Sequence, residues 1–336
     1  MITISKENRN RVVSDPAREG CRILVRDCAL LQPGESAVIV SDRHTQEIDQ
    51  LLTAAAREVS GNVRHHVVAP FTMHGIEPPD DVGRDMLEAA VAFGVTRMSM
   101  AHTNARSKAS LAGTRYLSLP DYSMEVLGGK ALRTDFIDQI TEADWLADLL
   151  SRAESVRVTT RSGTDVTCDV RGRIGNSAPG VCRTPGSLAS PPDVESNVPV
   201  VENGTHGTIV IDGSIPCAEI GKLSTPIVLK VENGIVVGIE GKLSPVVDRL
   251  FDSVGDPSAR VVAEFGIGLN PNATLCGSML EDEGCRGTCH FGIGSNITIG
   301  GQNEVPFHLD FVVRDAVIEL DGRTIMDHGQ LIKEAI

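Results

Sequence analysis

The stretch Ile227-Val-Leu-Lys-Val-Glu-Asn-Gly-Ile-Val-Val-Gly-Ile-Glu240 decides how the second half of this chain folds. Two runs rich in Val and Ile flank the pair Asn233-Gly234. Both residues of that pair tolerate a positive φ, which the tight turn of a two-residue β-hairpin requires. The stretch therefore predicts two antiparallel strands joined by a short turn.

The sequence around this hairpin keeps the same character from about residue 155 onward. Val, Ile and Thr occur in short runs separated by glycine, and further turn pairs stand at Ser162-Gly163 and Asp321-Gly322. The segment 176–192, rich in Gly, Pro and Ser, predicts a long loop. We therefore predict an α+β, mainly antiparallel domain over residues 151–336.

Residues 1–150 follow a different pattern, in which strand-like and helix-like segments alternate. Strands separated by helices pair in parallel through right-handed crossovers, so we predict an α/β domain with a parallel sheet. A helix is expected to start at Ser14-Asp15-Pro16, because a capping residue precedes a proline there. The expected strands are 36–40, 63–68 and 96–100, and the expected helices are 46–59, 79–93 and 134–153.

The composition excludes several classes of partner. A formal net charge of -14 disfavours nucleic acid, since phosphate backbones are bound mainly through Lys and Arg. An aromatic fraction of 3% argues against surfaces that stack bases or sugars. No apolar run follows the basic N-terminal residues or reaches the length of a membrane span. We expect a soluble, cytoplasmic protein that binds neither nucleic acid nor membrane, with its eight cysteines mostly reduced.

The segment 306–312, Pro-Phe-His-Leu-Asp-Phe-Val, is the sharpest chemical feature. Successive side chains of a strand point to opposite faces, so His308 and Asp310 should share one face while the apolar residues share the other. An imidazole and a carboxylate on a rigid strand suit a divalent metal such as zinc, manganese or iron. A hydrogen-bonded His/Asp pair on a solvated sheet face is the alternative.

Two further residues suggest a larger metal site. Glu264 is the only charged residue in the apolar run 261–268, and a buried carboxylate needs a cation or a shifted pKa. His290 ends a segment dense in potential ligands. Cys285 and Cys289 lie close to His290 in the sequence and could suggest a zinc site with thiolate ligands. This interpretation is less favoured, because no second cysteine pair completes such a site.

Several segments together resemble the M29 or aminopeptidase T family of metallopeptidases. They are AHTNARSKASLAGTRYLSLPD, NVPVVENGTHGTIVIDGS, AEFGIGLNPNA, EDEGCRGTCHFGIGSN, Gly300-Gly301 and FHLDFVV followed by Asp321-Gly322. The resemblance implies a homodimer and two divalent metals, zinc, manganese or cobalt, in each chain. The ligands that it implies are Glu202, Glu264, His290, His308 and Asp310. Glu202 enters the set through the resemblance alone.

The resemblance implies a metallo-aminopeptidase or amidohydrolase that acts on a short peptide or another small amide. Two bridged ions would lower the pKa of a water so that hydroxide is available at neutral pH. Asp310 is the expected bridge, because a carboxylate offers two oxygens. Glu202 or Glu264 would carry the proton to the leaving amine.

A ring-cleaving dioxygenase of the 2,5-dihydroxypyridine type is the alternative enzyme. It is similar in fold and in the closing His-x-Asp strand, and implies a single non-haem Fe(II). Its pattern has a His where this chain has Glu264, which favours the hydrolase. The peptidases have a Tyr where this chain has Ile297, which puts an ordinary peptide substrate in doubt. A binding or structural role is the third reading.

Overall fold

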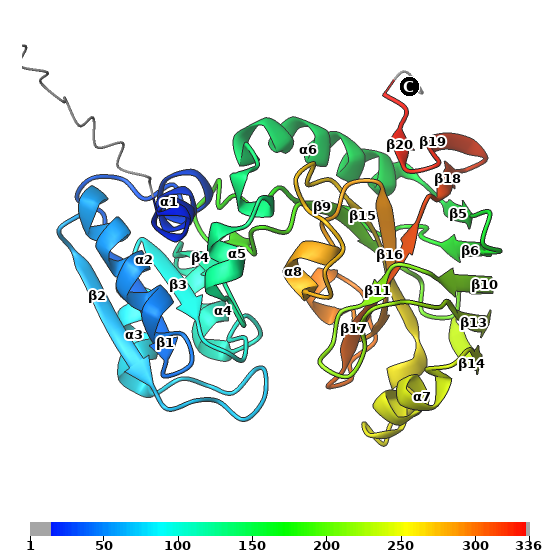
Figure 1. Cartoon of the computed structure of the whole chain (residues 1–336), viewed down its shortest axis with the longest axis horizontal. Helices are drawn as coiled ribbons and strands as arrows, with labels where there is room; N and C mark the ends of the chain where they lie inside the picture. The colour runs from blue at the N-terminus through cyan, green and yellow to red at the C-terminus, as the bar shows by residue number, and fades with distance from the viewer. Residues whose placement is uncertain (1–14, 334–336) are drawn as a thin grey trace, which may run out of the picture.

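The computed structural model describes residues 15–333 and contains one parallel and two antiparallel sheets (Figure 1). Figure 1 shows the parallel sheet at the left and the antiparallel sheets at the right, with helix α6 above and between them. The fold class expected from the sequence is therefore confirmed. Within the described residues, no helix is both long and apolar enough to cross a membrane.

The parallel sheet has the strand order β2-β1-β3-β4-β8. Its strands are β1 Ala37–Asp42, β2 Val63–Val68, β3 Val91–Val95, β4 Arg115–Ser118 and β8 Leu188–Ala189. The helices before and between them are α1 Pro16–Ile23, the π-helix η1 Leu24–Cys28, α2 Gln46–Val59, α3 Asp80–Glu88 and α4 Asn104–Leu111. The segments that lead out of the sheet are α5 Met124–Gly128, the short 3-10 helix η2 Ala131–Arg133 and α6 Phe136–Arg152.

Most of these elements lie where the sequence predicts them. Asp15 caps α1 by accepting a hydrogen bond from the Ala17 amide at 3.1 Å, with proline at the first helical position. Ser14 lies outside the described residues. Helix α2 and strand β2 have the predicted bounds.

Strand β3 is the main correction in this half. The sequence predicts a helix over 79–93 and a strand over 96–100, but α3 ends at Glu88 and the strand is Val91–Val95. All five residues of β3 are buried, as expected for a central strand that is covered on both faces. A continuous apolar run does not distinguish a buried strand from a buried helix, which explains the error.

The predicted loop 176–192 contains two short strands. β7 Asn176–Ala178 pairs with β9 Glu195–Pro199, and β8 pairs in parallel with β4. Strand β8 therefore lies in the second half of the sequence but belongs to the first sheet. The division at residue 150 stays a prediction.

The two antiparallel sheets have seven and eight strands. The seven-stranded sheet has the order β12-β11-β17-β16-β15-β9-β7 and the eight-stranded sheet the order β14-β13-β10-β6-β5-β18-β19-β20. Besides β7 and β9, the first contains β11 Ser214–Ile215, β12 Gly221–Lys222, β15 Val262–Gly268, β16 Thr288–Gly294 and β17 His308–Arg314. The second contains β5 Ser155–Thr159, β6 Asp165–Asp169, β10 Thr205–Ile211, β13 Ile227–Glu232, β14 Ile235–Glu240, β18 Val317–Leu320, β19 Arg323–Asp327 and β20 Gln330–Leu331.

Few helices interrupt these sheets. They are α7 Ser244–Asp252, α8 Met279–Asp282 and the 3-10 segments η3 Pro257–Arg260 and η4 Ile297–Ile299. The hairpin expected around Asn233-Gly234 joins β13 to β14, and the two turn residues have φ values of 49° and 78°. That prediction is confirmed.

Side-chain alternation gives the seven-stranded sheet two different faces. Phe265, Phe291 and Phe311 belong to an apolar cluster that also contains Val158 and Ile209 of the eight-stranded sheet. The residue before each of these phenylalanines must then point to the opposite face. Those three residues are Glu264, His290 and Asp310.

Candidate metal centre

Strand register brings the polar residues of three adjacent strands together. Glu264 of β15 lies opposite Gly292 of β16, which in turn lies opposite Asp310 of β17. Two residues further along β15, Gly266 lies opposite His290 of β16. Two residues before Asp310 on β17, His308 lies opposite Gly294 of β16. Polar side chains and glycines therefore alternate across this face of the sheet.

The glycines provide the space in which the histidines lie. A Cβ atom on Gly266 would lie 2.1 Å from Nε2 of His290. A Cβ atom on Gly292 would lie 2.6 Å from Cε1 of His308 and 2.8 Å from Cβ of Glu264. Both distances are far inside van der Waals contact, so any larger residue would displace the imidazoles or the carboxylate.

One set of donors, which we term the outer donor group, consists of Glu264, His308 and Asp310. Nε2 of His308 lies 3.3 Å from Oε2 of Glu264 and 3.3 Å from Oδ1 of Asp310. Nδ1 of the same ring donates a hydrogen bond to the Ser295 carbonyl at 2.8 Å. That bond directs Nε2 toward the carboxylates, as is usual for a metal-binding histidine. The carboxylates are buried, whereas the His308 side chain is 36% exposed.

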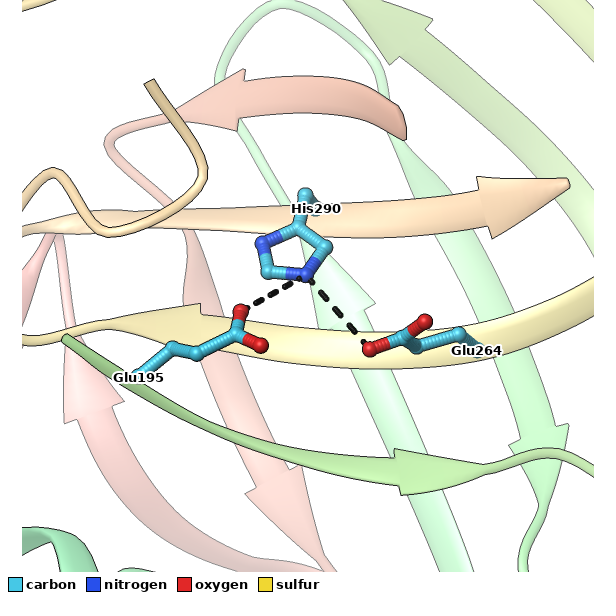
Figure 2. Close-up of side chains that lie close together, drawn as sticks. All are labelled: Glu195, Glu264 and His290. Atoms are coloured by element: carbon cyan, nitrogen blue, oxygen red, sulfur yellow. Dashed lines mark ion pairs between the residues drawn. The ribbon is translucent and has the colours of Figure 1, made fainter. Parts of the chain in front are cut away.

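A second set, the inner donor group, consists of Glu195, Glu264 and His290 (Figure 2). Nε2 of His290 lies 3.1 Å from Oε2 of Glu195 and 3.9 Å from Oε1 of Glu264. All three residues are buried. Glu264 thus takes part in both groups and directs a different oxygen to each histidine.

The pKa values of the donor residues are shifted strongly from their usual values. Burial raises the pKa of Glu264, although His290 and His308 partly oppose the shift. Burial also acts to raise the pKa of Asp310, but the charge of His308 and its hydrogen bond hold that pKa well below its usual range. Loss of water acts to lower the pKa of His308, but Asp310 and then Glu264 raise it to about 10. The outer donor group therefore behaves as a tight ion pair when no metal is bound.

Two more carboxylates enlarge the negative cluster. Burial, followed by the charges of neighbouring carboxylates, raises the pKa of both Asp193 and Glu283 well above the usual values. Oδ1 of Asp193, Oε1 of Glu283 and Nδ1 of His290 are buried without a hydrogen-bond partner, and the only partner of Oε2 of Glu195 among the described residues is the His290 ring. Buried polar atoms are rarely left unpaired, so these atoms indicate a missing partner. A divalent cation bound by carboxylates and imidazoles fits that requirement.

The structure brings together four of the five ligands expected from the sequence, namely Glu264, His290, His308 and Asp310. Glu202 lies outside both donor groups. Its Oε2 pairs with Nη2 of Arg173 at 2.5 Å, and its Oε1 accepts hydrogen bonds from Asn296 at 3.1 Å and the Gln302 amide at 2.7 Å. Strand β9 ends at Pro199, so Glu202 sits in the following turn and is bound by loop residues.

Glu195, which was not among the expected ligands, lies in the inner donor group. It lies on β9 opposite Gly268 and reaches His290 across β15. Asp193, Ser196 and Asn197 flank Glu195 in the sequence, so it lacks the apolar surroundings that singled out Glu264. The sequence pattern alone therefore gave no indication of this residue.

The N-terminal half contributes His102, which follows β3 and precedes α4. Loss of water around its ring, followed by the positive charges of Arg106, His308 and His74, lowers its pKa. The charge of His308 is among the causes of this shift, so the two imidazoles are close enough to interact electrostatically. Arg115, by contrast, is bound in a salt bridge to Glu35 and has a structural role.

Sequence similarity relates this chain to a family of dioxygenases. A family model described as NicX, 2,5-dihydroxypyridine 5,6-dioxygenase, matches residues 20–333. The 2,5-dihydroxypyridine 5,6-dioxygenase of Pseudomonas putida KT2440 is 26% identical over 257 residues, which are 73% of this chain and 72% of that protein.

Solved structures show the same fold. The structure of 2,5-dihydroxypyridine dioxygenase from Pseudomonas putida KT2440 matches with a TM-score of 0.80 and 20% identity, covering 96% of this chain and 98% of that one. Wild-type AmpT from Thermus thermophilus matches with a TM-score of 0.72 and 15% identity, covering 94% and 99%. The resemblance to the aminopeptidase T family is therefore supported as a relation of fold.

The sequence-based expectation of an amide- or peptide-cleaving hydrolase is wrong. The family match extends over residues 20–333 and agrees with the dioxygenase that stood as the alternative. Aminopeptidase, metalloprotease and amidohydrolase activities are set aside with it, as are the hydrolytic roles of Glu202 and Glu264. By sequence and by fold, this chain belongs to the 2,5-dihydroxypyridine 5,6-dioxygenase family.

Proposed function

We propose that this protein is a metal-dependent dioxygenase that opens a dihydroxylated pyridine ring or a closely similar nitrogen heterocycle. The family match over residues 20–333 carries the proposal. The buried cluster of carboxylates and imidazoles supports it, because ring opening with O2 by this class of enzyme requires a metal.

The outer donor group is the proposed site of that metal. Glu264, His308 and Asp310 offer two carboxylates and one imidazole, which suit divalent manganese or iron, and both of these metals can change oxidation state. Because His308 is partly exposed while the carboxylates are buried, the open side of the site is the side of His308. When bound, the metal would supply the Lewis acidity and redox chemistry that the reaction with O2 needs.

The substrate would enter between His308 and the N-terminal half. The lowered pKa of His102 keeps its imidazole neutral at neutral pH, so a ring nitrogen is free to accept a proton from a substrate hydroxyl. Arg106 lies beside it, with Nε hydrogen-bonded to the Ala101 carbonyl at 2.5 Å. The guanidinium charge would stabilise the oxyanion that forms when the hydroxyl loses its proton.

Oxygen uptake tests the proposal directly. Protein stripped of metal and reloaded anaerobically with Fe(II) or Mn(II) should consume O2 with 2,5-dihydroxypyridine, and the ultraviolet absorbance of the ring should disappear in parallel. His308→Ala should reduce the rate at least about 100-fold, since it removes a metal ligand and not only a supporting group. His328→Ala changes a histidine that belongs to neither donor group and should leave the rate unchanged.

The proposal fails if no divalent metal supports O2 uptake with this ring or with its hydroxypyridine analogues. Hydrolysis of amino-acid anilides by the same preparations, lost in His308→Ala, would also contradict it.

A further inference from the structure

The loop between β2 and α3 is longer than the connection requires. It runs from residue 69 to residue 79, whereas loops between a strand and a helix usually have about 2–6 residues. In Figure 1 it is the long loop at the lower edge of the parallel sheet. Because β1, β2 and β3 run in parallel, this loop and the segment that follows β3 lie at the same edge of the sheet. Loop 69–79 passes the end of β1 and reaches that segment, which carries His102.

Loop 69–79 contacts the chain just before His102. The Ser99 amide donates a hydrogen bond to Nδ1 of His74 at 3.0 Å, and the Gly75 amide donates to the Ser99 carbonyl at 2.9 Å. The Ser99 hydroxyl in turn accepts a hydrogen bond from the Ala101 amide at 3.1 Å. These bonds hold the backbone as far as the residue before His102.

The same loop contacts the chain just after His102. The amides of Asn104 and Ala105, in the first turn of α4, donate hydrogen bonds to the two carboxylate oxygens of Glu77, the second at 3.0 Å. Amides in the first turn of a helix have no partner within the helix, and a carboxylate is a favourable acceptor for them. His102 therefore lies between two anchor points that both belong to loop 69–79.

The backbone around His102 determines where its ring lies, because the residue itself is exposed. After loss of water and the charge of Arg106, the charges of His308 and His74 lower the pKa of His102, so its ring lies close enough to both to interact with them. A general base must lie within hydrogen-bond reach of the proton that it accepts. A displacement of the segment 99–105 would carry the His102 ring away from that position.

We propose that His74 and Glu77 are positioning residues, which hold the segment 99–105 so that His102 faces the substrate beside the outer donor group. The inference rests on the proposed function, since it concerns the reaction in which His102 accepts the substrate proton. Neither His74 nor Glu77 belongs to a donor group, so their loss should leave the metal content unchanged.

Hydrogen–deuterium exchange on the full-length protein tests whether Glu77 holds this segment. Glu77→Ala removes the acceptor of two backbone amides, so peptides that cover residues 99–105 should exchange at least about 10-fold faster than in the wild type. Glu47→Ala is the matched control, because it removes an exposed carboxylate from helix α2 of the same half. It should leave exchange in the segment unchanged. Unchanged exchange in Glu77→Ala overturns the inference.

Steady-state kinetics test the link to His102. Glu77→Ala and His74→Ala should each lower kcat about 10–100-fold at full metal content, since a misplacement of about 1 Å can slow a reaction about 100-fold. His74→Asn should restore most of the rate, because the side-chain oxygen of asparagine can accept the Ser99 hydrogen bond in place of Nδ1. In a His102→Asn background, Glu77→Ala should have little further effect on kcat, since a residue that acts through His102 has no influence once His102 is gone.

Losses that multiply in the Glu77→Ala/His102→Asn double variant would overturn the positioning role of Glu77. A His74→Asn variant as slow as His74→Ala would do the same for His74. Circular dichroism checks that each variant is folded, and Glu77→Gln, which keeps one acceptor oxygen, replaces Glu77→Ala in both measurements if that variant does not fold.

The two proposals fail in different ways. If Glu77→Ala accelerates exchange in the segment 99–105 but no metal makes the wild type active, the proposed reaction is wrong and the hold on the segment stands. If the wild type is active and Glu77→Ala changes neither exchange nor kcat, this inference alone is wrong.

Discussion

Oε2 of Glu264 lies 3.3 Å from Nε2 of His308, although their strands β15 and β17 are separated by β16. The two side chains meet because the intervening residue is Gly292, which has no side chain to keep them apart. The outer donor group therefore depends on the absence of a side chain at Gly292 as much as on the donor residues themselves.

Gly292→Ala should disrupt the outer donor group. The added Cβ would lie 2.6 Å from the His308 ring and 2.8 Å from Cβ of Glu264, so the ring must move away from Asp310. We expect a destabilisation of about 1–3 kcal/mol, typical of overpacking, together with weaker metal binding. Chemical denaturation and metal titration measure the two effects. Gly61→Ala is the control, since a Cβ there meets nothing within 4 Å, and it should stay within about 0.5 kcal/mol of the wild type.

Glu264→Gln should remove more metal than any other single change in the cluster. The amide keeps the shape of the side chain but loses the charge that both donor groups share. We expect bound metal to fall below one ion per chain and O2 uptake to fall at least about 100-fold. Elemental analysis beside rate measurements would show this, and a variant that retains metal and rate would contradict the shared role.

His102→Asn should slow turnover without changing metal content. If the neutral imidazole accepts the substrate proton, its loss should lower kcat about 10²–10⁴-fold and change the pH profile of kcat. His44→Asn, an exposed histidine in the same half of the chain, should behave like the wild type. Loss of metal in the His102 variant would instead mean that the residue supports the metal site.

The metal-free protein should lose stability as the pH rises. The pKa of His308 is raised to about 10, so its ion pairs stabilise the fold fully below about pH 6.5, the value for an unfolded histidine, and are lost as the pH approaches 10. The raised pKa values of Asp193 and Glu283 act in the same direction from lower pH upward. Asp310 has a lowered pKa, so its contribution is lost only in strong acid.

Unfolding midpoints measured from pH 6.5 to 10 test this trend, with roughly 2–4 °C lost for each kcal/mol. The wild type should lose more than His308→Gln over that range, because the variant lacks the titrating imidazole. Bound metal should make the unfolding midpoint of the wild type depend less on pH, since the donor residues then bind the ion in place of protons. An equal pH dependence of the unfolding midpoint in the metal-free wild type and in metal-free His308→Gln would contradict the assignment of this trend to His308.

The fold could be predicted well where local rules act alone. The Asn233-Gly234 turn follows from backbone conformation, and helix α2 follows from an unbroken helical pattern. Strand β3 could not be located, because its five residues are apolar and buried and so show no period of either kind. Strand β8 could not be predicted either, since two residues in a glycine- and proline-rich segment carry no strand signal.

Residues that lie in the two donor groups could be identified from the sequence more readily than the reaction of the enzyme. His308 and Asp310 follow from alternation along one strand, and Glu264 from an isolated charge in an apolar run. Glu202 was expected from a resemblance in sequence, which does not show where a chain leaves its strand, and it lies outside both donor groups. The reaction could not be predicted because dioxygenase and aminopeptidase structures share this fold, and a shared fold with metal ligands does not specify the chemistry.

Strand β8 gives the molecule an order of assembly during synthesis. Tyr116 and Leu117 of β4 pair with Leu188 and Ala189, and the Ser187 carbonyl accepts a further hydrogen bond from the Tyr116 amide at 2.9 Å. Until residue 189 has left the ribosome, β4 is an open edge that can associate with other chains. The first half of the polypeptide must therefore wait for part of the second before its own sheet is closed.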